Sequence, residues 1–150
     1  MAVLDLGNAV AVAAFHPPGT YNASRDGASV DTANFAYGAI VVNLGTLGSG
    51  AQLVTFHVEH AETAGGAYTA CKQLNSTDDA SIGPYRQNTA GDQMRLIRVD
   101  LNNVKRFVRL RAEHTGGGTH DYSASMVLMP YQTDATSPDT GSASAPSIEI

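Results

Sequence analysis

Short segments in which apolar and polar residues alternate, separated by glycine-rich turns, constrain the fold of this chain more than any other feature. The pattern is plainest at residues 35–44 (FAYGAIVVNL), 52–60 (QLVTFHVEH) and 121–131 (DYSASMVLMPY). Successive side chains of a β-strand point to opposite faces, so such a segment can bury one face and expose the other. The glycine-rich residues 45–50 between the first two segments favour a β-hairpin.

Other segments extend this pattern. Residues 67–74, 93–101 and 102–112 are predicted strands, and Gly116–Gly118 is a predicted hairpin turn. Residues 75–93 are rich in Asn, Ser, Thr, Asp and Gly, and are predicted to be a long irregular connection. With no convincing helical period, roughly six or seven short strands predict an all-β protein, a single antiparallel β-sandwich or jelly-roll-like domain.

One of the predicted strands is apolar on both of its faces. In residues 35–44, Ile40, Val41 and Val42 follow one another without a polar residue between them. Such a run is typical of a central strand that is covered on both sides.

The two ends differ in composition from the predicted sandwich body, residues 35–132. Residues 1–34 contain an HPPG stretch at 16–19, which favours extended chain followed by a turn. We predict that they form an extended N-terminal arm, with one edge strand near Ala9–Ala14. Residues 133–150 have too few large apolar side chains to offset the entropy lost on ordering, so we predict a flexible C-terminal tail.

The tail ends in a segment with β-strand character. In Ser147-Ile148-Glu149-Ile150, the two isoleucines fall on one face of a short terminal strand. A strand of this kind can add to the edge of another subunit's sheet. The alternative is a frayed end that binds nothing.

Positive charge is concentrated in one predicted strand. Four of the nine Lys and Arg residues lie in residues 102–112, although the chain has a net charge of −5. One face of this strand, which we call the basic ridge, carries Lys105, Phe107, Arg109 and Arg111. The ridge can stack on a nucleic-acid base, pair with carboxylates such as Asp100 or Glu113 on a solvated face, or meet an acidic partner protein. The net negative charge argues against non-specific binding to DNA or to an anionic membrane.

Candidate metal ligands and catalytic groups are few. Alternation places His57 and Glu59 on one side of a strand and His60 and Glu62 on the other, so one metal ion cannot easily collect all four. His114 and His120 can meet across the predicted hairpin turn, but two ligands are short of a closed metal site. The glycine runs lack the Lys-Ser/Thr of a phosphate-binding loop, and the sequence has no nucleophile elbow. We expect no enzymatic activity, no metal and no cofactor.

The remaining sequence signals concern the compartment of the protein. Cys71 is the only cysteine, so the chain has no internal disulfide, and we expect a small buried residue there. The absence of disulfides is compatible with assembly in a reducing cytosol. No Lys or Arg precedes Arg25, which argues against an export signal. No apolar run is long enough to cross a bilayer, so we expect no membrane partner.

The order of three segments resembles a known group of proteins. These segments are VVNLGTL (41–47), LVTFHVEHAET (53–63) and the pair of strands within 100–129. Together they resemble small β-rich virion proteins of tailed bacteriophages, over about residues 35–130. The insert at 75–93 and the long ends depart from that pattern.

This resemblance implies a capsid decoration, or cement, protein. Such a protein is not an enzyme. It is assembled in the host cytoplasm, sits on the outer capsid surface, binds the major capsid protein and associates with itself as a dimer or trimer. A tail or head–tail connector component is one alternative. A carbohydrate-binding β-sandwich of a receptor-binding protein is another, for which six Tyr and no Trp offer modest support.

The contacts that a decoration protein needs are assigned to the ends and to the basic ridge. We expect the N-terminal arm to contribute Phe15 and Tyr21, and the C-terminal strand to contribute Ile148 and Ile150. The basic ridge would supply the remaining partner-binding residues: Lys105, Phe107, Arg109 and Arg111.

Overall fold

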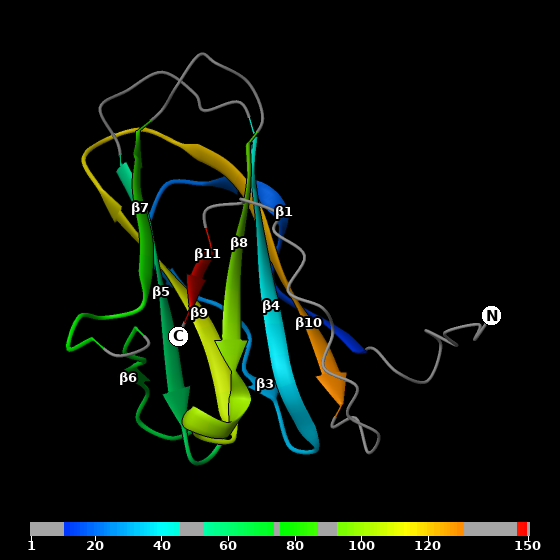
Figure 1. Cartoon of the computed structure of the whole chain (residues 1–150). Coiled ribbons are helices and arrows are strands. Elements are labelled where there is room, and N and C mark those ends of the chain that lie inside the picture. The colour runs from blue at the N-terminus through cyan, green and yellow to red at the C-terminus, as the bar shows by residue number, and fades with distance from the viewer. Residues whose placement is uncertain (1–10, 46–52, 74–75, 87–92, 131–146, 150) are drawn as a thin grey trace.

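The computed structural model describes residues 11–45, 53–73, 76–86, 93–130 and 147–149. These residues form an all-β structure in which two sheets pack face to face (Figure 1). The predicted β-sandwich is therefore confirmed. Within these ranges the only helical element is one 3₁₀ turn, η1 (Leu101–Asn103), and no helix is long and apolar enough to cross a membrane.

The first sheet, which we call sheet A, contains five strands. In order across the sheet they are β1 (Ala11–Tyr21), β10 (His120–Pro130), β4 (Phe35–Leu44), β8 (Gln93–Asp100) and β11 (Ser147–Glu149). Neighbouring strands are antiparallel, except that β11 runs parallel to β8. β4 has the bounds predicted for it and lies in the centre of the sheet, as the apolar run suggested.

The second sheet, which we call sheet B, is built around two long strands, β9 (Phe107–Thr115) and β5 (Leu53–Ala61). Four shorter strands complete it: β2 (Arg25–Asp26) and β3 (Val30–Asp31) pair with β9, and β6 (Thr69–Ala70) and β7 (Ser81–Arg86) pair with β5. The sandwich therefore pairs strands that are far apart in the sequence.

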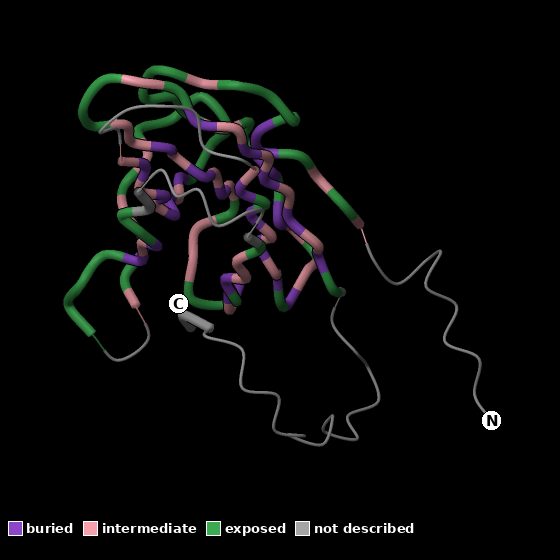
Figure 2. Tube along the Cα trace, turned by 90° about the horizontal axis from the view of Figure 1, so that it is seen from above, coloured by how far each residue is buried: buried purple, intermediate pink, exposed green. Residues whose placement is uncertain are grey.

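The core lies between the sheets, where the inward side chains of both layers meet (Figure 2). The alternation predicted the buried residues of three strands: Val54, Phe56 and Val58 on β5, Val108, Leu110 and Ala112 on β9, and Tyr122, Ala124, Met126 and Leu128 on β10. Phe56 meets Tyr122 edge to face, with ring centroids 5.1 Å apart, and this contact joins sheet B to sheet A.

The strand predicted at 102–112 begins later than expected, at Phe107. Asp100 explains the difference. One of its carboxylate oxygens accepts hydrogen bonds from the backbone and side chain of Asn102, and the other accepts from the side chain of Asn103. These bonds favour a turn over a sheet ladder. The prediction is wrong for residues 102–106 and confirmed from Phe107 onwards.

The region predicted as irregular, residues 75–93, contains a strand, β7, and that prediction is corrected here. β7 pairs with β5, and its Ile82 is buried in the core. The Gly83-Pro84 pair falls where the register shifts between Val54 and Phe56, and a bulge at that point accommodates a proline. Conversely, the strand predicted at 67–74 is reduced to the two residues of β6.

The described part of the predicted N-terminal arm, residues 11–34, is built into the sandwich. β1 pairs with β10 and continues through Pro17 and Pro18, which an edge strand tolerates because its outer N–H groups take no part in the ladder. Register shifts on either side of His16 let the consecutive Phe15 and His16 both face the core. Of the predicted tail, the structure describes only β11.

Candidate interaction surfaces

Arg109, in the centre of the basic ridge, is held by two carboxylates from other strands of sheet B. Its Nε donates to Glu59 Oε2 at 2.7 Å, and its Nη1 lies 2.8 Å from Asp26 Oδ2. The guanidinium also lies over the ring of Tyr68, 4.1 Å from the centroid. The side chains of Arg109 and Glu59 are only 20% and 10% exposed. Arg109 is therefore a partly buried cation that the sheet itself neutralises.

The neighbouring arginines are paired as well. Arg111 lies 4.0 Å from both of the carboxylates that hold Arg109. Arg106, which precedes β9, forms a two-point pair with Asp31 through N–O distances of 2.7 and 3.0 Å. Hydrogen bonding to this guanidinium lowers the pKa of Asp31 to about 2.

Of the three interpretations of the basic ridge, the geometry favours pairing with carboxylates on a solvated face. The carboxylates are not the expected ones, because Asp100 bonds to η1 and Glu113 lies 3.2 Å from Nε2 of His57. Asp26 and Glu59 are distant from the ridge in the sequence, and pairing of β2 and β5 with β9 brings them to it. Ion pairing thus occupies the two ridge arginines within the folded chain.

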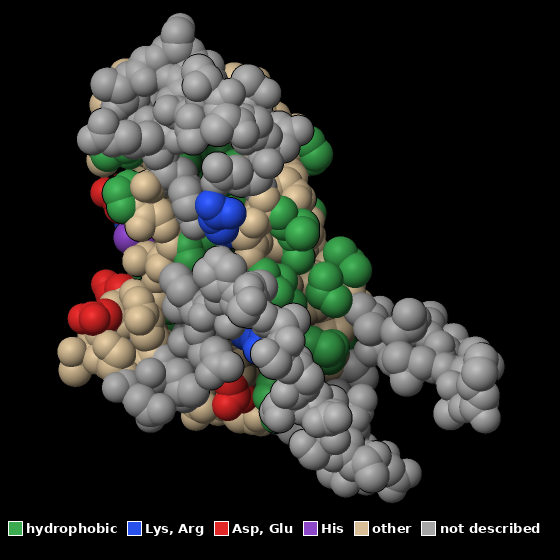
Figure 3. Space-filling model, turned by 45° about the horizontal axis from the view of Figure 1, so that its top comes forward, with side chains coloured by type: hydrophobic (Ala, Val, Ile, Leu, Met, Phe, Trp, Pro, Cys, Tyr) green, Lys and Arg blue, Asp and Glu red, His purple; other side chains and the backbone are tan. Residues whose placement is uncertain are grey.

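The outer face of sheet A has the opposite character. All four large apolar side chains that are exposed in the described part of the chain lie on it: Val12, Tyr37, Met94 and Met129, at 69%, 56%, 68% and 40% exposure. The strand register places smaller or half-buried apolar residues in the same rows: Ala14, Ala39, Val41, Leu96 and Val127. We call these residues together the apolar face. Hydrophobic side chains gather on this side of the molecule in Figure 3.

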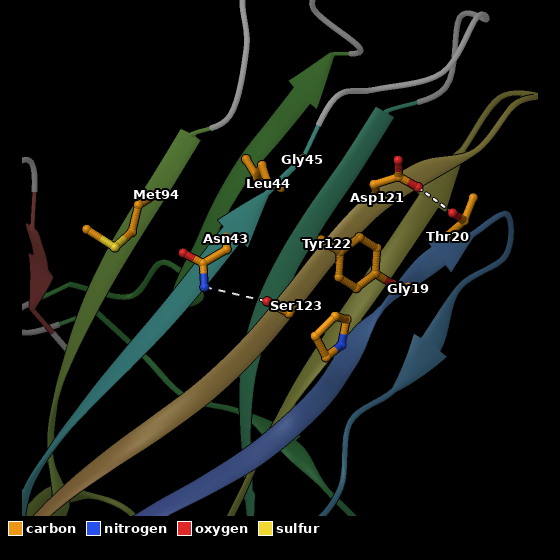
Figure 4. Close-up of a pocket in the computed structure, with 10 residues that line it drawn as sticks. Gly19, Thr20, Asn43, Leu44, Gly45, Met94, Asp121, Tyr122 and Ser123 are labelled. Carbon is orange, nitrogen blue, oxygen red and sulfur yellow. Dashed lines mark hydrogen bonds between the residues drawn. The ribbon is translucent and has the colours of Figure 1, made fainter.

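A groove opens at one end of the apolar face (Figure 4) and has a volume of about 510 Å³. Its lining residues come from four strands of sheet A and the turn after β4: Pro18, Gly19, Thr20, Asn43, Leu44, Gly45, Met94, Asp121, Tyr122 and Ser123. Thr20 donates a hydrogen bond to Asp121, and Asn43 Nδ2 donates to Ser123 Oγ at 3.5 Å. The volume lies in the range of small-ligand sites, and the lining combines apolar groups with a few polar ones.

Two histidines, His16 and His114, contact Tyr122, and a third, His120, contacts His114. The rings of His114 and His120 meet edge to face at 5.4 Å, so the predicted meeting across the hairpin is confirmed. His114 Nε2 lies 3.2 Å from the Tyr122 hydroxyl, and the ring of His16 lies 5.6 Å from that of Tyr122. Burial lowers the pKa of His114 to about 4 and also lowers that of His16. In the described ranges, no three His, Cys, Asp or Glu residues are placed to hold a metal ion.

The structure does not bring the predicted contact residues to one surface. Phe15 is buried in the core, whereas Tyr21 is half-buried, with its ring 4.5 Å from that of Tyr122. Lys105 and Phe107 are half-buried, Phe107 at the start of β9 in sheet B, and the backbone N–H of Lys105 donates to His60 Nδ1. Of the remaining predicted contact residues, Ile148 pairs with β8 at the edge of sheet A, and Ile150 lies outside the described residues.

The residues of the apolar face were missing from the predicted contacts, although one signal pointed to them. The apolar run in β4 predicted cover on both sides. Sheet B covers the inward side chains Ile40 and Val42, and Val41 faces outward within the apolar face.

Comparisons with known proteins support the fold alone. No known protein family and no curated relative matches the sequence. Among solved structures, one chain in the structure of infectious bursal disease virus Gt strain matches with a TM-score of 0.54 and 8% identity. The match covers 81% of this chain, which spans about a third (33%) of the length of the viral one. At that identity the likeness shows that this sandwich is shared with a chain from a virus structure.

Proposed function

We propose that this chain is a structural virion protein that binds the outer surface of a tailed-phage capsid and cements neighbouring major capsid subunits. The apolar face of sheet A is the observation that carries the proposal. Exposed apolar side chains gathered on one face mark a contact with another subunit, here a capsid subunit or a neighbouring copy of this chain on the shell, whereas single exposed apolar residues are normal on any surface. The likeness to a chain of a virus structure, and the resemblance of residues 35–130 to phage virion proteins, point the same way.

The fold suits an architectural role. Long-range strand pairing makes a stiff sandwich, and its two outer faces differ: sheet B presents ion pairs to water, and sheet A presents apolar groups. Copies that bind only the expanded, mature shell stabilise that state by mass action. Association of copies as dimers or trimers joins several weak contacts to the shell, and linked contacts bind more tightly than each one alone.

Sedimentation with phage heads tests the proposal. The purified full chain is mixed with undecorated mature heads and, separately, with unexpanded precursor heads of a host phage, and the pellets are analysed. We expect the chain to sediment with mature heads only, at a saturating ratio set by the lattice. Binding to neither kind of head, or an enzymatic turnover, would contradict the proposal.

The groove favours a second candidate function, a carbohydrate-binding module of a receptor-binding protein. Its lining includes the amide of Asn43, the hydroxyls of Thr20 and Ser123, and the carboxylate of Asp121 within one open site. A glycan panel distinguishes the two. Specific glycan binding that Asn43→Ala abolishes, without sedimentation on heads, would favour the carbohydrate-binding function.

A further inference from the structure

We infer that the apolar face of sheet A is covered by the same face of a second copy of this chain. The inference rests on the proposed function, because it assigns a surface to the self-association which that function includes. In this dimer, sheet A of one copy packs face to face with sheet A of the other about a two-fold axis.

The side-chain pattern shows that this face is built to be covered. An antiparallel sheet with one solvated face alternates apolar-in and polar-out, and β9 follows that rule with Arg109 and Arg111 outward. β4 breaks the rule. Its outward positions Tyr37, Ala39 and Val41 are apolar, like the inward ones.

The charge distribution favours a second copy as the cover. Each copy carries a net charge of −5, so two copies repel each other through their charged surfaces. The repulsion between two copies is least where they meet through a face that carries little charge. Among the described residues, β1 and β4 place no charged side chain in the outward rows of the apolar face; the charged neighbours are Arg98 and Asp100 on β8, where Arg98 lies opposite Ala39, and Asp121 at the groove. A partner protein that binds through opposite charge would need a patch of charged side chains of one sign on this face. An uncharged apolar face is instead complementary to itself, as an isologous contact requires.

The shape of the face also fits a second copy. Two twisted sheets pack face to face at a separation of about 10 Å with their strands nearly aligned, and interdigitating outward side chains fill the space between them. The apolar face covers four neighbouring strands of sheet A: β1, β10, β4 and β8. With a strand spacing of about 4.8 Å and a rise of about 3.4 Å per residue, its area is roughly 300–500 Å². A standard stable interface buries about 800 Å² per partner, so we expect a weak dimer that is populated at high concentration.

Sedimentation velocity of the full chain, from micromolar to near-millimolar concentration, tests the inference in the absence of capsids. We expect a reversible monomer–dimer equilibrium. The double variant Val12→Glu/Tyr37→Glu adds two charges at exposed positions of the apolar face and should stay monomeric. The matched control, Thr69→Glu/Thr115→Glu, adds the same charge to exposed positions of sheet B and should dimerise like the wild type.

Methionine oxidation by dilute peroxide identifies the buried surface without any substitution. Met94 and Met129 are exposed on the apolar face, and Met126 is buried in the core. We expect oxidation of the first two to slow several-fold as the dimer forms, while Met126 stays protected at every concentration.

Three results would overturn the inference. The first is a dimer that the double variant does not weaken, because the contact then lies elsewhere. The second is a wild-type monomer at every concentration whose Met94 and Met129 become protected only on mature heads; the capsid then covers the face, and the proposed function stands. The third is a monomer that dimerises only after residues 131–150 are deleted, because the chain then covers its own face.

Discussion

Replacing Arg109 with Met tests whether the basic ridge serves stability. The substitution keeps an apolar stem against Tyr68 but removes the guanidinium from Glu59 and Asp26. A hydrogen bond to a charged group contributes about 1.5–3 kcal/mol, and breaking a fully buried ion pair costs about 3–5 kcal/mol. We discount these values because Arg109 is 20% exposed and Arg111 still lies 4.0 Å from Glu59. The expected loss of unfolding free energy is about 2 kcal/mol.

A double-mutant cycle with Glu59→Met isolates the pair. Removing both partners leaves no unpaired buried charge, so the double variant should lose less than the sum of the single losses, with a coupling energy of about 1–2 kcal/mol. Urea unfolding at neutral pH measures all four proteins, and an unchanged m-value shows that the unfolded state is comparable.

Arg106→Met is the matched control for this cycle. Both side chains of the Arg106–Asp31 pair are about half exposed, so solvent screens the pair and its loss should cost less than the loss of Arg109. The reasoning would be refuted if Arg109→Met cost no more than this control and its effect added to that of Glu59→Met without coupling. Ridge arginines that contribute no stability would again be candidates for an acidic partner.

Three further predictions follow from the structure. Burial lowers the pKa of His114 to about 4 and lowers that of His16 below the ordinary 6.5, so the stability of the fold should be fully present above pH 6.5 and fall as the pH drops towards 4. Urea unfolding across this range measures how the free energy of unfolding depends on pH, and His114→Phe should reduce that dependence. Gly27→Ala should lower the free energy of unfolding by about 1–3 kcal/mol in the same assay, because the new Cβ would lie 2.6 Å from the Leu110 carbonyl oxygen. In Gly117→Ala the new Cβ meets nothing within 4 Å, so that variant should be nearly as stable as the wild type. Deleting residues 134–150 should weaken sedimentation with mature heads, while circular dichroism shows the sandwich still folded apart from the short edge strand β11. Equal sedimentation would show that the tail has no part in binding.

The strands predicted correctly are those whose pattern is local. β4, β5, β10 and most of β9 alternate or are continuously apolar over eight or more residues, and burial of one face is decided within each segment. The strand predicted at 93–101 is confirmed as β8. β7 escaped prediction because its glycine and proline are tolerated only opposite a register shift in β5. A single segment does not reveal such a shift.

The interaction surfaces were predicted less well, because they depend on which strands become neighbours. The sequence places Arg109 and Arg111 on one face of a strand, and that is confirmed. It does not reveal that Asp26 and Glu59 flank them, since those residues come from β2 and β5. The apolar face likewise combines outward residues of four strands, and only the run around Val41 signals it locally.

Imaging of the assembled phage particle by electron cryomicroscopy tests the central claim most directly. We predict sandwich-shaped density for this chain on the outside of the mature shell, at sites that bridge capsid subunits, with the outer face of sheet A buried against a second copy. Particles that lack this chain altogether would contradict the proposed virion role. Copies whose sheet A is bare to solvent would contradict the contact that we infer for it.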